Sequence, residues 1–242
     1  MTPRLRKLLF ETLYKNRYLY RFASTIPFAG QWRVWQRLVL PRLHGQDILE
    51  LGCGLGDLLA DMLEAGYRCQ AVEHSPEMVS AARATLRRRE SGQPSLIIQG
   101  TAQHLPFSPS TFDTVVSTFP SEYIYDPDSI AEIARVLRPG GRLIVIEGAN
   151  LLPVGFVQPA LVLLQSLVYG PHQQHDPHEE ERTSQSVEVI TEVIPDARFG
   201  LHIPLERFNL QRRSERVRSR RWEVYITIGT QKIEAPPLCP VV

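Results

Sequence analysis

Residues 48–57 read Ile-Leu-Glu-Leu-Gly-Cys-Gly-Leu-Gly-Asp, a short apolar run that leads into glycines at alternate positions. A helical pattern of apolar residues begins directly after Gly56. Glycine lets the backbone turn sharply and lets a ligand approach it, and the start of a helix offers unpaired N–H donors. The stretch therefore predicts a strand, a ligand-binding turn and a helix, in that order.

The chain around this stretch alternates short apolar runs with helical stretches. Predicted strands are residues 47–51, 68–73, 95–100, 112–117 and 142–147, and predicted helices are residues 58–66, 76–89 and 129–137. Such alternation is typical of crossover units that build a parallel sheet with helices on both faces. Because the runs are apolar on both faces, we expect buried strands.

Glu73 ends the second predicted strand, beside the expected ligand site. A carboxylate at that place in a doubly wound sheet can accept hydrogen bonds from both hydroxyls of a ribose. The dinucleotide fingerprint would need a third glycine at position 57, where this chain has Asp57. This difference counts against a nicotinamide-dependent oxidoreductase.

Several motifs in order resemble those of class I S-adenosylmethionine-dependent methyltransferases, within them the ubiquinone/menaquinone-methyltransferase-like, small-molecule branch. The motifs are Glu50 with the glycine turn, Glu73, GTAQHLPF at 100–107, FDTVVS at 112–117 and VLRPGGRLIV at 136–145. The resemblance is close over about residues 45–148 and extends in outline over 184–230. It implies an α/β fold with a doubly wound, seven-stranded, mostly parallel Rossmann-like sheet, and S-adenosylmethionine as cofactor with S-adenosylhomocysteine as product.

The resemblance also implies roles for residues at the glycine turn. Glu50 would orient the turn and reach the methionyl ammonium of the cofactor through water. Gly52 and Gly54 would let the amino-acid part of the cofactor lie against the chain, and Glu73 would hold the ribose.

Two later segments would complete the cofactor site in the same way. Ala102 and Gln103 would meet the adenine edge, and Ser117, Thr118 and Phe119 would lie near the sulfonium and the methyl acceptor. Thr101 departs from the aspartate common in relatives; a hydroxyl is a neutral acceptor, roughly half as strong as a carboxylate. The departure predicts a lower affinity for the cofactor.

Methyl transfer from a sulfonium needs alignment and exclusion of water more than a dedicated base. If a base is used, Glu122, Tyr123 and Tyr125 are the candidates, and an aromatic loop without catalytic role is the alternative. The Asn/Asp-Pro-Pro-aromatic motif of nucleic-acid amino methylases is absent at 118–122.

We expect three parts in the chain. Residues 1–44, two amphipathic helices broken near Pro27, form an N-terminal helical cap that either packs on the main domain or serves as a membrane-surface or substrate lid. Residues 45–230 form the methyltransferase domain, with a lid insertion after the fifth strand at about 149–182, and residues 231–242 form a tail. The uncharged stretch 150–171 contains prolines, which favours a lid over a membrane span.

Toward the C-terminus, Val187, Ile190 and Ile194 at helical spacing predict a last helix, followed by two antiparallel strands. The arginine run from Arg212 to Arg221 is expected at the exposed turn between those strands. The alternative is a patch, formed with the basic N-terminus, for anionic lipid head groups or an acidic substrate. His172, His175 and His178 lie in a proline-containing loop and are interpreted as a polar hinge, so no metal site is predicted.

The net charge and the cysteine count restrict the expected binding partners and cellular compartment. The net charge of +1 gives no reason to expect DNA, and the odd number of cysteines, 3, fits free thiols in a reducing compartment. We expect a cytoplasmic protein, with peripheral membrane contact and oligomeric state left open.

The functional prediction is methyl transfer to a small acceptor. A lipophilic acceptor is favoured by the uncharged stretch 150–171 and by aromatic residues such as Phe119. The alternatives are a non-catalytic S-adenosylmethionine-binding scaffold and an RNA-directed methyltransferase.

Overall fold

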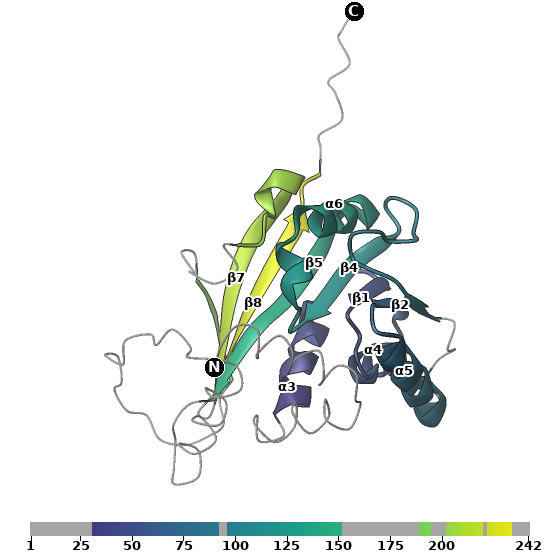
Figure 1. The fold of residues 1–242 in the computed structure, drawn as a ribbon. Helices are drawn as coiled ribbons and strands as arrows, with labels where there is room; N and C mark the ends of the chain where they lie inside the picture. The colour runs from purple at the N-terminus through teal and green to yellow at the C-terminus, as the bar shows by residue number, and fades with distance from the viewer. Residues whose placement is uncertain (1–30, 92–95, 152–188, 195–201, 220–221, 234–242) are drawn as a thin grey trace, which may run out of the picture.

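The computed structural model describes residues 31–91, 96–151, 189–194, 202–219 and 222–233. These residues form one eight-stranded sheet in the order β3-β2-β1-β4-β5-β8-β7-β6 (Figure 1). The strands are β1 (Asp47–Leu51), β2 (Arg68–Glu73), β3 (Ile97–Gln99), β4 (Phe112–Thr118), β5 (Leu137–Leu151), β6 (Ile190–Val193), β7 (Leu210–Ser219) and β8 (Trp222–Gln231). The α-helices are α3 (Trp32–Gln36), α4 (Asp57–Glu64), α5 (Pro76–Arg89) and α6 (Pro127–Val136), and the 3-10 helices are η1 (Arg37–Arg42), η3 (Glu122–Tyr125) and η4 (Glu206–Phe208).

The first five strands are parallel and confirm the expected doubly wound α/β class. From β1 the chain moves outward through β2 to β3, then returns to the other side of β1 as β4 and continues to β5. The direction of winding therefore reverses between β1 and β4. Ligands of open parallel sheets bind at such a reversal, outside the carboxyl ends of the strands.

The expected number of strands was wrong, because the sheet has eight and not seven. The additional strand is β6, which pairs with β7 antiparallel where the spacing of Ile190 and Ile194 predicted a helix. All four residues of β6 are exposed, so its apolar side chains do not mark a buried helix face. Pairing with a neighbouring strand outweighs the local pattern here.

The position predicted for the arginine run was also wrong. Arg212 to Arg218 lie within β7 instead of forming the turn after it, and the rest of the run lies outside the described residues. Arg212 pairs with Glu206 at 2.9 Å and Arg216 with Glu192 at 2.7 Å. Acidic partners thus offset much of the positive charge of this strand.

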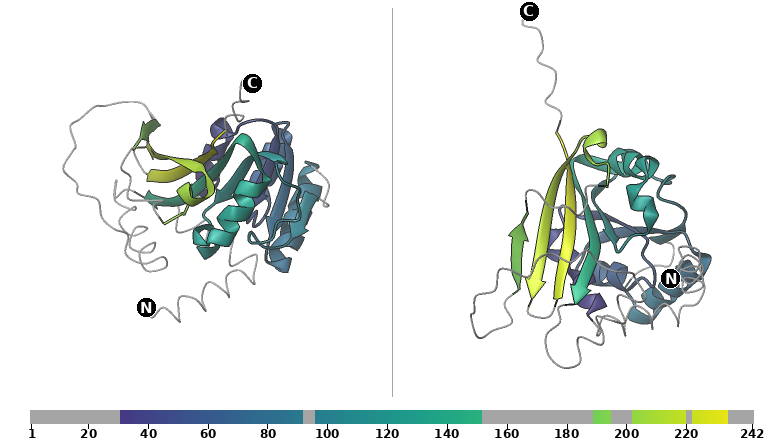
Figure 2. Two further views of the ribbon diagram at one scale, coloured as in Figure 1. Left: turned by 90° about the horizontal axis from the view of Figure 1, so that it is seen from above. Right: turned by 60° about the vertical axis from the view of Figure 1, so that its left-hand side comes forward.

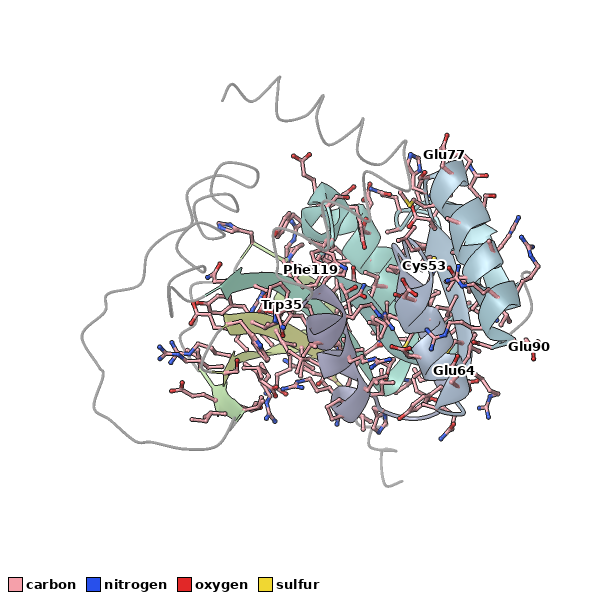
Figure 3. All side chains as sticks on the ribbon, turned by 90° about the horizontal axis from the view of Figure 1, so that it is seen from below. Trp35, Cys53, Glu64, Glu77, Glu90 and Phe119 are labelled. Carbon is pink, nitrogen blue, oxygen red and sulfur yellow. The ribbon has the colours of Figure 1, made fainter. Side chains whose placement is uncertain are left out.

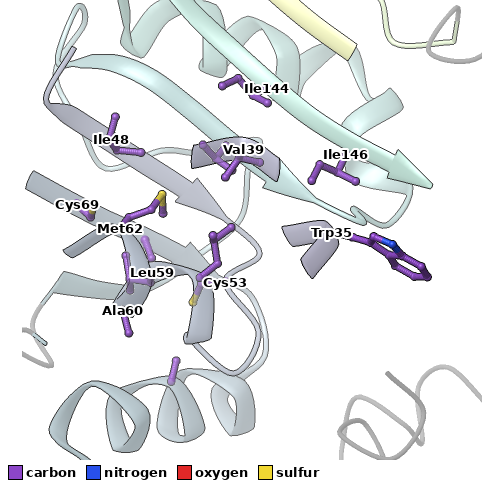
Figure 4. Packing of buried hydrophobic residues seen from close by; sticks show 14 of the residues in the cluster. Trp35, Val39, Ile48, Cys53, Leu59, Ala60, Met62, Cys69, Ile144 and Ile146 are labelled. Atoms are coloured by element: carbon purple, nitrogen blue, oxygen red, sulfur yellow. The ribbon is translucent and has the colours of Figure 1, made fainter. Parts of the chain in front are cut away.

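Helices cover both faces of the sheet (Figure 2). Consecutive residues of β5 point to opposite faces: Ile144 and Ile146 join the core layer under α3, α4 and α5, whereas Leu143 and Val145 join the layer under α6 and η4. Figure 4 shows part of the first layer. Two-sided burial of this kind explains why the parallel strands read as continuous apolar runs.

The segment of α3 and η1 packs on the first layer. Trp35 and Val39 are fully buried there, and the ring of Trp35 meets that of Trp222 edge-on with centroids 6.3 Å apart. Figure 1 places α3 at the end of β4. The segment therefore crosses this face of the sheet, from Gln36 at Thr118, the end of β4, to Arg42, whose carbonyl accepts a hydrogen bond from Arg142 opposite Thr114 near the start of β4. Residues 1–30 of the expected cap lie outside the described residues.

Asp61 of α4 fastens this segment to the domain. Its side chain is 5% exposed and accepts hydrogen bonds from Arg33, from Arg37 at 2.7 Å and from Arg89 of α5 at 2.8 Å. Burial acts to raise the pKa of Asp61, but the hydrogen bonds from Arg37 and Arg89 outweigh it, so the pKa lies below its usual value. One carboxylate thus joins three helical segments.

Asp61→Asn is expected to lower the free energy of unfolding by about 1–3 kcal/mol at pH 7, because the arginines lose their anion but stay close enough to solvent to be hydrated. Urea unfolding measures this. Because folding lowers the pKa of Asp61, its contribution is present at neutral pH and disappears as pH falls through that lowered value. The difference between variant and wild type should therefore vanish in acid. Glu64→Gln, which removes a half-exposed partner of Arg89, is the control and should lower the free energy of unfolding clearly less than Asp61→Asn.

Within the described ranges, no helix has the length and apolar character needed to cross a membrane. Over the same ranges, no cluster of three or more His, Cys, Asp or Glu side chains could hold a metal ion. The histidines of the expected hinge and most of the expected lid at 149–182 lie outside the described residues.

Candidate functional site

The strands of the parallel half end level with one another. Leu51 of β1 stands opposite Val72 of β2 and Ser117 of β4. Gln99 of β3 stands opposite Glu73. The residues that the sequence assigned to the cofactor therefore lie along one edge of the sheet, around the reversal between β1 and β4.

The glycine turn has a backbone that other residues adopt only with strain. Gly52, Gly54 and Gly56 have φ values of +70°, +52° and +75°. A Cβ on Gly56 would lie 2.9 Å from the Cβ of Ala82, so the third glycine lets the turn pack against α5. A Cβ on Gly52 would lie 3.1 Å from the hydroxyl of Tyr123. Both glycines thus allow close packing, and Gly52 itself is exposed, so its backbone is open to a ligand.

Glu73 ties the turn to the start of α5. Its Oε2 accepts a hydrogen bond from the Gly54 N–H at 3.0 Å and its Oε1 from the Ser75 N–H at 2.9 Å, and the residue is 7% exposed. A carboxylate has about four lone-pair sites. Both oxygens therefore retain acceptor capacity for two hydroxyls of a ligand.

Glu50 is a buried acid beneath the turn. Its side chain is 1% exposed, and within the described part of the chain its Oε2 is buried without a hydrogen-bond partner. Burial raises the pKa of Glu50 to about 8; the charge of Arg33 opposes this rise, and that of Glu73 adds to it. A cationic group placed at Oε2 would meet an unused acceptor and would favour the ionised form.

The loop after β3 carries the predicted adenine contacts. Thr101 is exposed and pairs with His104 in an isolated bridge, whereas Ala102 is buried. The Gln103 amide donates to Asp126 Oδ2 at 2.9 Å, and Asp126 also caps α6. In this structure Gln103 therefore fixes the loop to the start of α6.

Tyr123 bridges the strands on the two sides of the reversal. Its hydroxyl donates to the Leu51 carbonyl at 3.1 Å and lies 2.6 Å from Ser117 Oγ. A hydroxyl carries one hydrogen, and here a backbone carbonyl takes it. The geometry gives Tyr123 a role in holding the ends of β1 and β4 together.

An aromatic stack follows β4. Phe119 has a φ of +51°, and its N–H donates to the Ile146 carbonyl of β5 at 2.7 Å. The ring of Trp32 stacks on it at 4.1 Å between centroids with an interplanar angle of 27°. Figure 3 shows Phe119 and Trp35 next to each other at α3. Next to the stack, the Gln36 amide of α3 donates to Thr118 Oγ1 at 3.4 Å.

The sequence did not place Trp32 in the site. Its spacing from Trp35 indicated only one face of a helix, and the contact with Phe119 depends on where that helix packs. A side chain of the N-terminal segment thus reaches the end of the strand expected to carry the methyl acceptor.

The two remaining candidate bases lie on η3. Glu122 is exposed, and Tyr125 is 43% exposed. Burial and then the charge of Glu147 raise the pKa of Tyr125. A tyrosine with a raised pKa keeps its proton at neutral pH, so Tyr125 is suited to donate a hydrogen bond and not to act as a base.

The comparison with protein families matches this geometry. A family model described as a methyltransferase domain matches residues 49–145, from β1 into β5. Over these residues the chain is similar to class I methyltransferase domains. The cofactor of this class is S-adenosylmethionine, in agreement with the resemblance seen in the sequence.

Among curated relatives, the methyltransferase domain is similar to enzymes named demethylmenaquinone methyltransferase. The one from Lactiplantibacillus plantarum is 31% identical over 146 residues, covering 57% of this chain and 60% of the relative. The one from Symbiobacterium thermophilum is 32% identical over 153 residues, covering 59% of this chain and 58% of the relative. The chain therefore matches about three fifths of the length of these relatives.

Solved structures support the fold of the methyltransferase domain. A S-adenosylmethionine-dependent methyltransferase of Thermotoga maritima superposes with a TM-score of 0.55 at 16% identity, covering 91% of this chain and 98% of that one. One from Methanosarcina mazei gives a TM-score of 0.50 at 19% identity, covering 81% of this chain and 98% of that one.

The residues of the domain fit the cofactor of its class. The buried Oε2 of Glu50 is an acceptor for an ammonium, and the exposed Gly52 leaves its backbone open to the amino-acid part of the cofactor. Glu73 keeps acceptor capacity for a ribose. The burial and hydrogen bonds of these residues follow from the packing of the chain itself.

Proposed function

We propose that the protein transfers a methyl group from S-adenosylmethionine to a small lipophilic acceptor, and that this acceptor is the reduced form of a naphthoquinone. The cofactor half of the proposal rests on one observation: Glu50 and Glu73 present acceptor oxygens on either side of a glycine turn at the reversal of the sheet. The acceptor half is supported by the name demethylmenaquinone methyltransferase that the relatives carry.

Different residues of the chain would bind different parts of the cofactor. Glu50 receives the ammonium, Glu73 the two ribose hydroxyls, and the loop of residues 101–103 the adenine. Ser117 and Thr118, at the end of β4, then lie at the sulfonium. The cofactor supplies a methyl group on a positively charged sulfur, and the protein's task is to align the acceptor and exclude water.

The stack of Trp32 on Phe119 supplies an aromatic surface for the acceptor. It lies directly beyond Thr118, and the strained φ of Phe119 is held by the hydrogen bond to β5. Flat apolar rings pack favourably on aromatic side chains. A naphthoquinol ring is an occupant of matching shape and polarity.

RNA is less well supported as an acceptor. The arginines of β7 that suggested it, Arg212 and Arg216, pair with Glu206 and Glu192. A surface for nucleic acid needs cations that can neutralise phosphates.

The test is an assay of methyl transfer by the full chain. Purified protein is incubated with S-adenosylmethionine labelled in its methyl group and with 1,4-dihydroxynaphthalene kept reduced. We expect label in the naphthoquinol and equimolar S-adenosylhomocysteine. Binding of S-adenosylmethionine without transfer to this or other lipophilic phenols would favour the scaffold, and no binding would reject the proposal.

Trp32→Ala is expected to raise the KM for the naphthoquinol about tenfold, since an aromatic pair contributes roughly 0.5–1.5 kcal/mol beyond its buried area. The Kd for S-adenosylmethionine should stay within about twofold, because the ring of Trp32 stacks on Phe119, directly after β4. Trp32→Phe keeps an aromatic ring and should keep most of the acceptor affinity. An equal loss of cofactor affinity in Trp32→Ala would contradict the assignment.

A further inference from the structure

Glu147 lies at the carboxyl end of β5, where the pairing with β8 is irregular. Ile146 stands opposite Ile226 and Gly148 opposite Tyr225, so that Glu147 has no counterpart on β8. Bulges of this kind occur next to active sites, where they redirect a side chain out of the regular ladder. The sequence placed Glu147 only as the last residue of a predicted strand.

The neighbours of Glu147 belong to the site described above. The residue before it, Ile146, pairs with Thr118 and accepts the hydrogen bond from the Phe119 N–H. On η3, Tyr125 is close enough for the charge of Glu147 to raise its pKa. Ile146 faces the layer that Phe119 and Trp32 join, so the alternation of β5 points Glu147 to the other face, on which η3 packs. Glu147 therefore lies at the carboxyl edge of the sheet, next in the chain to the backbone contact with Phe119.

The surroundings of Glu147 combine burial with open space. The residue is half-buried, and its Oε1 is shielded from solvent. A Cβ built on the adjacent Gly148 meets no atom of the described residues within 4 Å. A carboxylate partly removed from water at the carboxyl edge of the sheet is suited to exchange a proton with a ligand bound there.

We propose that Glu147 is the general base for the methyl acceptor, taking the proton of an acceptor hydroxyl. The inference rests on the proposed function. The other candidate bases at this edge of the sheet are less suited to the role. Glu122 is exposed, the Tyr123 hydroxyl donates to a backbone carbonyl, and Tyr125 keeps its proton.

The reaction balances with Glu147 in this role. The naphthoquinol O–H gives its proton to Glu147, the adjacent ring carbon bonds to the methyl, and the methyl–sulfur bond breaks with its electron pair left on sulfur. The resulting ketone then loses the proton of the methylated ring carbon to water while Glu147 returns its proton to the oxygen. The products are methylated quinol, S-adenosylhomocysteine and one proton released to solvent.

A comparison of two acceptors distinguishes proton removal by Glu147 from any other role of this residue. 1,4-Dihydroxynaphthalene is neutral at the assay pH and needs a base, whereas 2-hydroxy-1,4-naphthoquinone is already an anion and needs none. Glu147→Gln is expected to lower kcat with the neutral acceptor about a hundredfold. With the ionised acceptor, kcat should change by less than about threefold, because no proton has to be taken.

Two controls accompany this comparison. Glu90→Gln changes an exposed carboxylate at the end of α5 and should leave both rates unchanged. Calorimetry should give Glu147→Gln the wild-type Kd for S-adenosylmethionine, which shows that its cofactor site is intact.

The outcomes distinguish this inference from the proposed function. Equal losses with both acceptors, or no loss with either, would overturn the role of Glu147 and leave the proposed function standing. If the wild type methylates neither acceptor, the naphthoquinol assignment is wrong and the role of Glu147 falls with it.

Discussion

Replacing Glu73 with alanine is expected to weaken binding of S-adenosylmethionine about a hundredfold or more. Two hydrogen bonds from ribose hydroxyls to a carboxylate are worth about 1.5–3 kcal/mol each. The substitution also removes the acceptor of the Gly54 and Ser75 N–H groups, which hold the glycine turn to α5. Calorimetric titration of the purified full chain at pH 7 measures the change.

Glu77→Gln is the matched control for Glu73→Ala. Glu77 is an exposed acid on the first turn of α5, labelled in Figure 3, and should leave the Kd within about twofold. Unfolding in urea separates loss of binding from loss of fold. If the Glu73→Ala protein stays folded and binds the cofactor as tightly as the wild type, Glu73 does not bind the ribose.

The parallel half of the fold was readable from the sequence because its signals are local. The first two strands have the bounds predicted for them, 47–51 and 68–73, and the glycine turn lies between the first strand and its helix. A buried strand requires a continuous run of apolar residues, and a turn with positive φ favours glycine. Both signals sit within a few residues of the feature they specify.

Features that depend on distant contacts were not readable in this way. Ile190 and Ile194 have a spacing that suits a helix, yet β6 is a strand because β7 offers it a partner. Trp32 meets Phe119 only once α3 lies across the end of β4. The bulge at Glu147 is a mismatch between β5 and β8, which no single segment of sequence contains.

Glu50→Gln is expected to weaken cofactor binding and to abolish its coupling to protons. Burial raises the pKa of Glu50 to about 8, so the acid is mostly protonated at pH 7 in the free protein. An ammonium at Oε2 favours the carboxylate, and binding should therefore release close to one proton. Calorimetry at pH 7 in two buffers of different ionisation enthalpy counts these protons. The glutamine variant should release almost none and bind about tenfold more weakly or worse.

The same substitution should stabilise the cofactor-free protein at alkaline pH. The pKa of Glu50 is about 8 when folded, above its ordinary value of 4.5, so the folded state binds this proton more tightly than the unfolded state. Stability from this group is complete below the unfolded pKa and is lost as pH rises toward 8. At pH 9 the glutamine variant should therefore exceed the wild type by about 2–4 kcal/mol in the free energy of unfolding, and at pH 5 the difference should be small.

A cofactor-free wild type as stable as Glu50→Gln at pH 9 would show that the acid ionises there without cost, as it would if water reached Oε2. The variant could also lose proton release while having the same stability as the wild type at pH 9. In that case the ammonium of the cofactor, and not burial of Glu50, would determine how many protons are released on binding. Observing both effects together would show why an acid is kept buried under the glycine turn, with no hydrogen-bond partner for Oε2 among the described residues. The free protein gives up stability at this position, and the cation of the cofactor supplies the missing partner.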